Sequence, residues 1–202
     1  MFKKFASEAL GLSDIGSIVE PKDYGSVDAD DYLFHEDGER IFFLIKSKKD
    51  EYCFTNLALI HVDGDSAVSS KRSIKRYDWA SHPVRGVAIE TAGTIDMDIE
   101  LKFTIGDEDF SIDVRKRFIE PLKDIYKALI AIGKQQKADA AGREHALRAL
   151  DATASMHKLN TAASPAAVTA QFDALLEALN AAVLVRHTKR DFSDVFTRYL
   201  QA

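Results

Sequence analysis

Residues 89–103 read IETAGTIDMDIELKF, and this stretch decides the fold. From residue 94 onward polar and apolar side chains alternate strictly, and a period of two places the two kinds on opposite faces of a β-strand. Ala92-Gly93 predicts a tight turn to the preceding run, residues 84–90. The stretch therefore predicts an antiparallel hairpin with one apolar and one solvated face. The apolar positions are Ile95, Met97, Ile99, Leu101 and Phe103.

The solvated face of this strand is unusually acidic. Asp96, Asp98 and Glu100 follow one another at successive same-side positions, and like charges so close destabilise a sheet. Either nearby basic groups offset them or they serve a partner. Lys102 continues the row, and Asp113 is expected on the neighbouring strand. We interpret these five residues as a candidate interaction face.

The surrounding sequence predicts more strands of the same kind. About seven short β runs with turn signals between them lie within residues 41–115, a pattern typical of an antiparallel sandwich or barrel. The period then changes to that of a helix, with Phe118, Leu122, Ile125 and Leu129 on one stripe. The prediction is an α+β chain: a seven-stranded antiparallel open barrel, capped by a helix and followed by an α-helical hairpin.

The tail differs in composition, since 17 of its 68 residues (135–202) are alanine. We expect helices over residues 135–159 and from Ser164-Pro165 onward, forming an antiparallel hairpin, and a last helical piece over residues 191–200. Two helices joined this way bury one stripe each, so the hairpin is expected to pack on another copy of itself. The candidate oligomer contacts are Phe172, Leu176, Leu179, Val183, Phe192, Phe196 and Tyr199. The expected divisions are a lead-in (1–34), a barrel domain (35–134) and the hairpin extension (135–202).

Composition restricts the class of protein. The net charge of −5 is unevenly spread, with about −6 on residues 1–134 and about +1 on the tail, and an acidic body argues against nucleic acid as a ligand. The single Cys53 lies in an apolar run and fits a buried residue of a reduced, cytoplasmic protein. No continuous apolar run approaches the roughly 18 residues of a membrane span. The chain has no P-loop, dinucleotide fingerprint or paired metal-ligand spacing, so no cofactor is expected.

Specific residues resemble the signature of the bacterial pleckstrin-homology-like family. The pattern ETAG-x-x-D-x-D-x-E-L-K over residues 90–102 carries most of the likeness, which covers residues 35–132. The segments Gly38-Glu39-x-Ile41, Phe54-Thr55-Asn56, Leu59-Ile60 and Asp63 resemble the family's opening strands. Residues 64–72 depart from the family's usual turn, and the tail is similar to a hairpin extension that some members carry. The resemblance implies a PH-like barrel, a ring-shaped homo-oligomer, a hydrophilic surface that binds proteins where strands of adjacent subunits meet, and no enzymatic activity.

Other readings of the charged residues stay open. The acidic row could bind a divalent metal ion or act in acid–base catalysis, although side chains two apart on a strand are about 7 Å apart, too far for one ion to gather all three. The basic set could bind phosphate, lipid head groups or acidic protein, or could meet the acidic row of an adjacent subunit. Its members are Lys71, Arg72, Lys75, Arg76 and Arg85.

The favoured hypothesis is a non-enzymatic cytoplasmic assembly module that binds itself and other proteins. The alternative is a peripheral module that contacts anionic lipid through residues 2–5 or the basic loop, which the acidic body opposes. A metal-dependent enzyme is less favoured than either.

Overall fold

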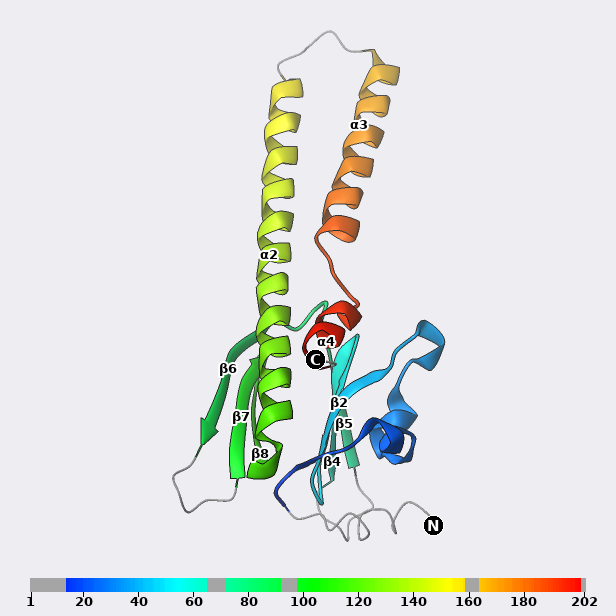
Figure 1. Cartoon of the computed structure of the whole chain (residues 1–202). Coiled ribbons are helices and arrows are strands. Elements are labelled where there is room, and N and C mark those ends of the chain that lie inside the picture. Colours follow the sequence, from blue (N-terminus) through cyan, green and yellow to red (C-terminus); the bar gives the residue numbers. More distant parts are fainter. Residues whose placement is uncertain (1–13, 65–71, 92–97, 159–163, 201–202) are drawn as a thin grey trace. The chain divides into compact units, whose positions relative to one another are not determined.

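A computed structural model describes residues 14–64, 72–91, 98–158 and 164–200. It contains two compact units: residues 1–133 with 190–202, and residues 134–189. The first unit is built on two antiparallel sheets, with strand order β1-β2-β3-β4-β5 in one and β6-β7-β8 in the other (Figure 1). The predicted fold class is confirmed: the sheets remain an open pair, and helix α2 (Ile119–Lys158) follows the last strand.

The five-stranded sheet holds the first run of predicted strands. Its strands are β1 (Ser17–Ile18), β2 (Ile41–Lys46), β3 (Glu51–Thr55), β4 (Ala58–Gly64) and β5 (Arg72–Asp78). Strand β1 has no counterpart among the seven expected strands, because two residues are too short to show a period. The chain at Gly16 also joins the two sheets, since its N–H donates to the carbonyl of Asp113 at 2.7 Å and its carbonyl accepts from the N–H of Arg115.

The three-stranded sheet contains the stretch that predicted the fold. Its strands are β6 (Val84–Thr91), β7 (Asp98–Ile105) and β8 (Glu108–Arg115). Buried and partly exposed residues alternate along all eight positions of β7, which confirms the period-two prediction for this part of the stretch. The predicted turn at residues 92–93 and the side chains of Ile95, Asp96 and Met97 lie outside the described residues.

The lead-in covers the outer face of the five-stranded sheet. It consists of three short 3-10 helices: η1 (Pro21–Ser26), η2 (Asp28–Tyr32) and η3 (His35–Asp37). Apolar residues of the lead-in, such as Val27 and Leu33, form a second core cluster with Leu44, Cys53 and Ile60. The prediction that Cys53 is a core residue is thereby confirmed.

Two buried glutamates attach the lead-in to this sheet. The Glu51 carboxylate accepts the backbone N–H of Ala29 at 2.8 Å and also pairs with Lys46. Glu39 accepts the backbone N–H of Phe34 and pairs with Arg76 at 2.9 Å. Each is only 2% exposed, so both charges depend on these partners.

The core between the sheets is closed by the first half of α2. Its residues Leu122, Ile125 and Leu129 are fully buried, as the helical stripe predicted. The sequence suggested that this helix and the hairpin are separate elements, but α2 runs without a break for 40 residues. Gly133 lies within the helix, and its backbone does not adopt the left-handed conformation of a helix-terminating glycine. A Cβ there would lie 2.6 Å from the carbonyl oxygen of Val84, so glycine permits close packing.

The last helix, α4 (Ser193–Leu200), belongs to the first unit, not to the hairpin. Phe192 and Phe196 are fully buried in the main core, and the Phe196 ring lies near that of Trp79. The expectation that these two residues contact another copy is therefore wrong: the tail was treated as one helical extension, whereas its end completes the barrel core. Tyr199 is partly buried against the same core. Trp79 is buried in this core as well.

The second unit is a helical hairpin. It contains the distal part of α2, helix α3 (Pro165–Asn180) and a π-helical turn, η5 (Ala181–Arg186). The Ser164 side chain caps α3 by accepting the N–H of Ala167, as the Ser-Pro signal predicted. Among its described residues, this unit buries no hydrophobic side chain, and α3 has no buried residue.

Candidate interaction surfaces

The outward face of β7 carries the polar residues that the sequence placed there. Asp98, Glu100 and Lys102 occupy the partly exposed positions of the strand, and Asp113 lies on the adjacent strand β8. Asp96, the remaining member of the predicted face, lies outside the described residues. The strand geometry thus brings four of the five predicted residues to one side of the sheet.

Three carboxylates lie abreast across this sheet. The register pairs Glu90 of β6 with Glu100 of β7, and Glu100 with Asp113 of β8. Lys102 offsets part of the charge, since its Nζ lies 2.8 Å from a carboxylate oxygen of Glu90 and 3.0 Å from one of Glu100. The basic group expected from another subunit is therefore supplied, for these two acids, by the same chain. Glu90 was missed by sequence reasoning because the register between β6 and β7 was unknown.

Two of these carboxylates, Glu100 and Asp113, differ in their surroundings, and their pKa values shift in opposite directions. Hydrogen bonds from Ser111 and Lys102 lower the pKa of Glu100. The pKa of Asp113 is raised, first by partial burial and then by the nearby charges of Asp98 and Glu100. The surroundings of Asp113 thus disfavour its negative charge, whereas those of Glu100 favour it.

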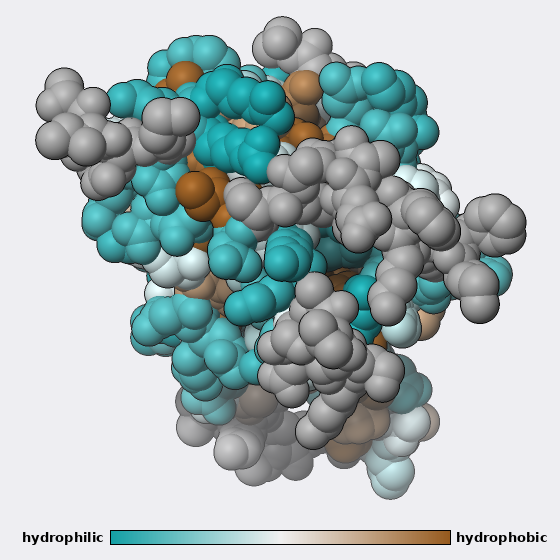
Figure 2. Space-filling view, turned by 90° about the horizontal axis from the view of Figure 1, so that it is seen from below, coloured by the Kyte–Doolittle hydropathy of each residue, from teal (hydrophilic) through white to brown (hydrophobic). Residues whose placement is uncertain are grey.

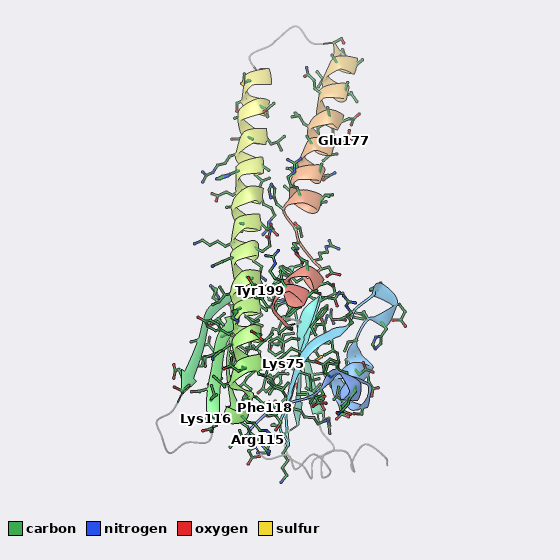
Figure 3. The ribbon with its side chains drawn as sticks, in the orientation of Figure 1. Lys75, Arg115, Lys116, Phe118, Glu177 and Tyr199 are labelled. Carbon is green, nitrogen blue, oxygen red and sulfur yellow. The ribbon has the colours of Figure 1, made fainter. Side chains whose placement is uncertain are left out.

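The predicted basic set does not form one surface. Arg76 lies on the outer face of β5 between Glu39 and Asp78, with nitrogen–oxygen distances of 2.9 and 2.7 Å. Arg72 pairs with Asp28 of the lead-in. Lys75 (labelled in Figure 3) lies on the opposite face of β5, 3.8 Å from Glu108.

The two remaining residues of the predicted basic set do not form a shared site with the other three. Arg85 donates to the carbonyl of Gly106 in the loop after β7, and Lys71 lies outside the described residues. A different local acid therefore lies beside each of the four described residues, Asp107 being 4.0 Å from Arg85. In Figure 2, the described residues on the face in view are predominantly hydrophilic.

The hairpin presents apolar side chains to solvent. Phe172 is 62% exposed and Leu176 is 44% exposed, whereas Leu179 and Val183 are half-buried. Leu147, Met156, Val168, Leu184 and Val185 are also exposed. An apolar surface of this kind is typical of a binding surface.

By length and composition, the helical segment Pro165–Arg186 could also cross a membrane. Its most apolar window has a mean hydropathy of 1.4, and none of that window is buried. The sequence analysis found no continuous apolar run of this length, because polar residues such as Glu177 and Asn180 interrupt the segment. Glu177 lies in this segment on α3 (Figure 3).

The described residues contain no group of three or more His, Cys, Asp or Glu side chains that could hold a metal ion. At the acidic face, the Lys102 ammonium occupies the position between Glu90 and Glu100. This arrangement favours binding of a complementary surface over binding of a cation.

Comparison with known proteins decides the family. The sequence model of the bacterial PH domain matches residues 9–132, more than half of the chain. The chain belongs to the bacterial PH domain family. Its similarity to two bacterial proteins extends beyond the PH domain into the helical tail.

The first of these is the uncharacterized protein YvbH of Bacillus subtilis (strain 168), 48% identical over 204 residues that cover 99% of each chain. The second is a PH domain containing bacterial protein from Exiguobacterium sibiricum 255-15, whose crystal structure matches with a TM-score of 0.83. It is 40% identical, and the match covers 92% of this chain and 99% of that chain. The resemblance stated from residues 35–132 is confirmed.

Sequence reasoning also missed Asn56, which attaches the C-terminal segment to the PH domain. Its backbone carbonyl accepts the N–H of Phe192 at 2.9 Å, and its side chain donates to Asp191 at the same distance. The Asp191 pKa is lowered: burial acts to raise it, but the hydrogen bonds from Ser193 and Asn56 outweigh that effect. The Phe54-Thr55-Asn56 motif included Asn56, but the sequence did not indicate that Asp191 and Phe192 are its partners.

Proposed function

We propose that this bacterial PH domain protein is a non-catalytic assembly module that self-associates through its hairpin and presents its acidic sheet face to other proteins. The observation that carries this proposal is the absence of any buried hydrophobic side chain among the described residues of the hairpin. Burial of apolar surface is the main stabilising term in helix packing. A hairpin that lacks it gains stability by pairing with a second hairpin, as in a four-helix bundle.

The apolar stripe around Phe172 and Leu176 is the proposed contact between copies. Burying one such large side chain contributes about 1.5–3 kcal/mol, and each residue contributes twice in a symmetric dimer. Phe192 and Phe196 have no part in this contact because the PH core buries them.

A ring requires a further contact between PH domains. Strands β5 and β6 lie at the ends of their sheets, and such edges have backbone groups able to pair with a neighbouring strand. Arg72 and Lys75 lie on β5 and Glu90 lies on β6, so a β5-to-β6 contact would join opposite charges. Arg72, Lys75 and Glu90 each already pair with a charged residue of their own chain. Contact between hairpins is therefore the primary element of the proposal.

Sedimentation of the full chain at micromolar concentration tests the self-association. We expect an oligomer for the natural protein and a shift toward monomer for the double variant F172S/L176S. The control is Y32S, which removes a similarly exposed aromatic side chain from the PH domain. A natural protein that sediments as a monomer would contradict the proposal, as would a double variant with unchanged mass.

The proposed partner surface is tested separately with E100Q/D113N. Proteins retained on the immobilised natural chain should be lost from this variant while its oligomeric mass stays the same. The control D124N removes an exposed carboxylate that pairs with Lys127 on α2, and it should retain them. Equal retention by both variants would exclude the acidic face as the binding surface.

Membrane contact is the second candidate, supported by the unburied apolar segment Pro165–Arg186. Asp173 and Glu177 oppose it, because a charged side chain at the centre of a bilayer costs about 2.5–3.5 kcal/mol on insertion scales. Flotation with vesicles of anionic phospholipid distinguishes the assembly module from membrane contact. A chain that self-associates without lipid and does not float with the vesicles at low salt supports the assembly module.

A further inference from the structure

The hairpin contains a cavity of about 520 Å³ between α2 and the segment formed by α3 and η5. This volume falls within the range of about 300–1,000 Å³ typical of small-molecule sites. Along most of its length the cavity is lined by alanine and leucine side chains, among them Ala149, Leu150, Leu175 and Ala178. The small alanine side chains leave the space between the helices unfilled.

One end of the cavity is lined by an arginine and two histidines. His145 of α2 lies there with Arg186 and His187, where the chain leaves η5. Arg143 fixes this end by donating to the backbone carbonyl of His187. Within the described part of the chain, the side chains of Arg186 and His145 have no hydrogen bond or ion pair, and no carboxylate lines the cavity.

We propose that this cavity binds a single-chain amphiphile with a carboxylate head group, such as a long-chain fatty acid. The guanidinium of Arg186 supplies the geometry that binds a carboxylate through two parallel hydrogen bonds, and the two imidazoles add donors beside it. The alkyl chain occupies the alanine- and leucine-lined part of the cavity. Charge complementarity favours this ligand over an apolar side chain of a second copy, because only the amphiphile brings a carboxylate that can pair with Arg186.

The site is distinct from the proposed contact between copies. The cavity is lined by Leu175 and Leu179, whereas Phe172 and Leu176 do not line it. The inference therefore does not depend on the proposed function, and F172S/L176S should bind the amphiphile even where it no longer self-associates.

Calorimetric titration of the full chain with dodecanoate, below the concentration at which it forms micelles, tests the inference. We expect saturable binding of one dodecanoate per chain and at least tenfold weaker binding of dodecyltrimethylammonium, which has a similar chain and the opposite charge. R186Q should weaken dodecanoate binding about tenfold or more, because it removes charge-assisted hydrogen bonds to the carboxylate. The control R148Q alters an exposed arginine that pairs with Glu144 outside the cavity, and it should bind as the natural chain does.

A second pair of variants tests the apolar part. A178F fills the cavity and should abolish binding, whereas A170F adds the same side chain to an exposed position of α3 that does not line it. Circular dichroism of each variant establishes that the helices are intact. No saturable binding by the natural chain, equal affinity for the cationic amphiphile, or unchanged affinity in R186Q would each overturn the proposal.

Discussion

The ring of Phe196 stacks on the ring of Phe42, with centroids 5.3 Å apart and an angle of 22° between the planes. One residue lies on the C-terminal helix α4 and the other on strand β2, so this contact joins distant parts of the sequence. The helical hairpin is thereby an insertion between two segments that complete a single PH domain core.

Removal of the Phe196 ring should destabilise the PH domain strongly. Truncation of a fully buried phenylalanine to alanine costs about 3–5 kcal/mol, because apolar contact is lost and a cavity remains. F196A should therefore lower the urea midpoint of the natural chain, measured by the fluorescence of Trp79. The control Y32A removes an exposed ring of the same unit and should leave that midpoint nearly unchanged; equal effects of the two substitutions would contradict the assignment of α4 to the core.

The carboxylate of Glu51 should be needed to hold the lead-in. E51A would leave the N–H groups of Asp28 and Ala29 without their acceptor and the ammonium of Lys46 without its partner. Removing one partner of a buried ion pair lowers the free energy of unfolding by about 3–5 kcal/mol. The loss should appear as a lower free energy of unfolding and as faster hydrogen exchange of the Ala29 amide.

The exposed pair of Glu20 and Lys22 provides the control for Glu51. Its nitrogen–oxygen distance is 2.7 Å, but both side chains are largely exposed. Water screens such surface pairs and they contribute little to stability, so E20A should have little effect. Similar losses in E20A and E51A would show that burial of Glu51 does not determine its contribution.

The substitution D113N should stabilise the protein at neutral pH. The pKa of Asp113 is raised above its ordinary value of 3.8, mainly by partial burial and then by Asp98 and Glu100. The folded state therefore binds the proton more tightly than the unfolded state, and the free energy of unfolding falls as pH rises through the interval between the two pKa values. Relief of like charges across strands is worth about 0.2–1 kcal/mol.

Thermal unfolding at two pH values checks the sign of this effect. D113N should melt above the natural chain at pH 7, and the difference should disappear near pH 3, where Asp113 is largely protonated in both states. The control D109N alters a carboxylate of the same strand that accepts a 2.7 Å hydrogen bond from Thr104, and it should give no stabilisation. A D113N variant that is less stable at pH 7 would contradict the prediction.

Alanine substitutions at two glycines of α2 should have opposite outcomes. Alanine favours a helix interior by about 1 kcal/mol over glycine. At Gly133 the new Cβ would meet the backbone of Val84 at 2.6 Å, so G133A should be destabilising because the strand must shift. At Gly142 the clash is with the side chain of His187, which can rotate, so G142A should cost little or be stabilising.

Denaturant unfolding of the full chain, with fluorescence for the PH domain and circular dichroism for the helices, measures both glycine variants. A neutral G133A would show that β6 and α2 are not held at the distance described. A strongly destabilising G142A would show that His187 cannot move away from α2.

The sequence predicted those parts of the fold that have a regular local period. Strand β7 and the buried stripe of α2 follow from alternation and from the helical repeat, and the ETAG-x-x-D-x-D-x-E-L-K pattern indicated the family. Which residues of the tail are buried could not be predicted in this way. Phe172 and Phe196 both recur at helical spacing, yet one is exposed and the other fully buried, because burial depends on which distant surface the helix meets.

The candidate interaction surfaces could likewise be predicted only in part. Alternation predicted that Asp98, Glu100 and Lys102 share a face, but the alignment of Glu90 with Glu100 depends on strand register. The basic residues were grouped by nearness in sequence, whereas the strand places Lys75 and Arg76 on opposite faces. The hairpin cavity brings His145 and Arg186 together only through the antiparallel arrangement of the helices.

The return of α4 to the PH domain has a consequence for biosynthesis. Strands β2 to β8 and the first turns of α2 are made before the ribosome reaches the hairpin, but the rings that complete their core come at residues 192 and 196. At roughly 5–20 residues per second, translation of the intervening segment takes about 3–12 s. During that interval the nascent barrel exposes Trp79 and Phe42, so chaperones and proteases can recognise an incomplete chain until α4 seals it.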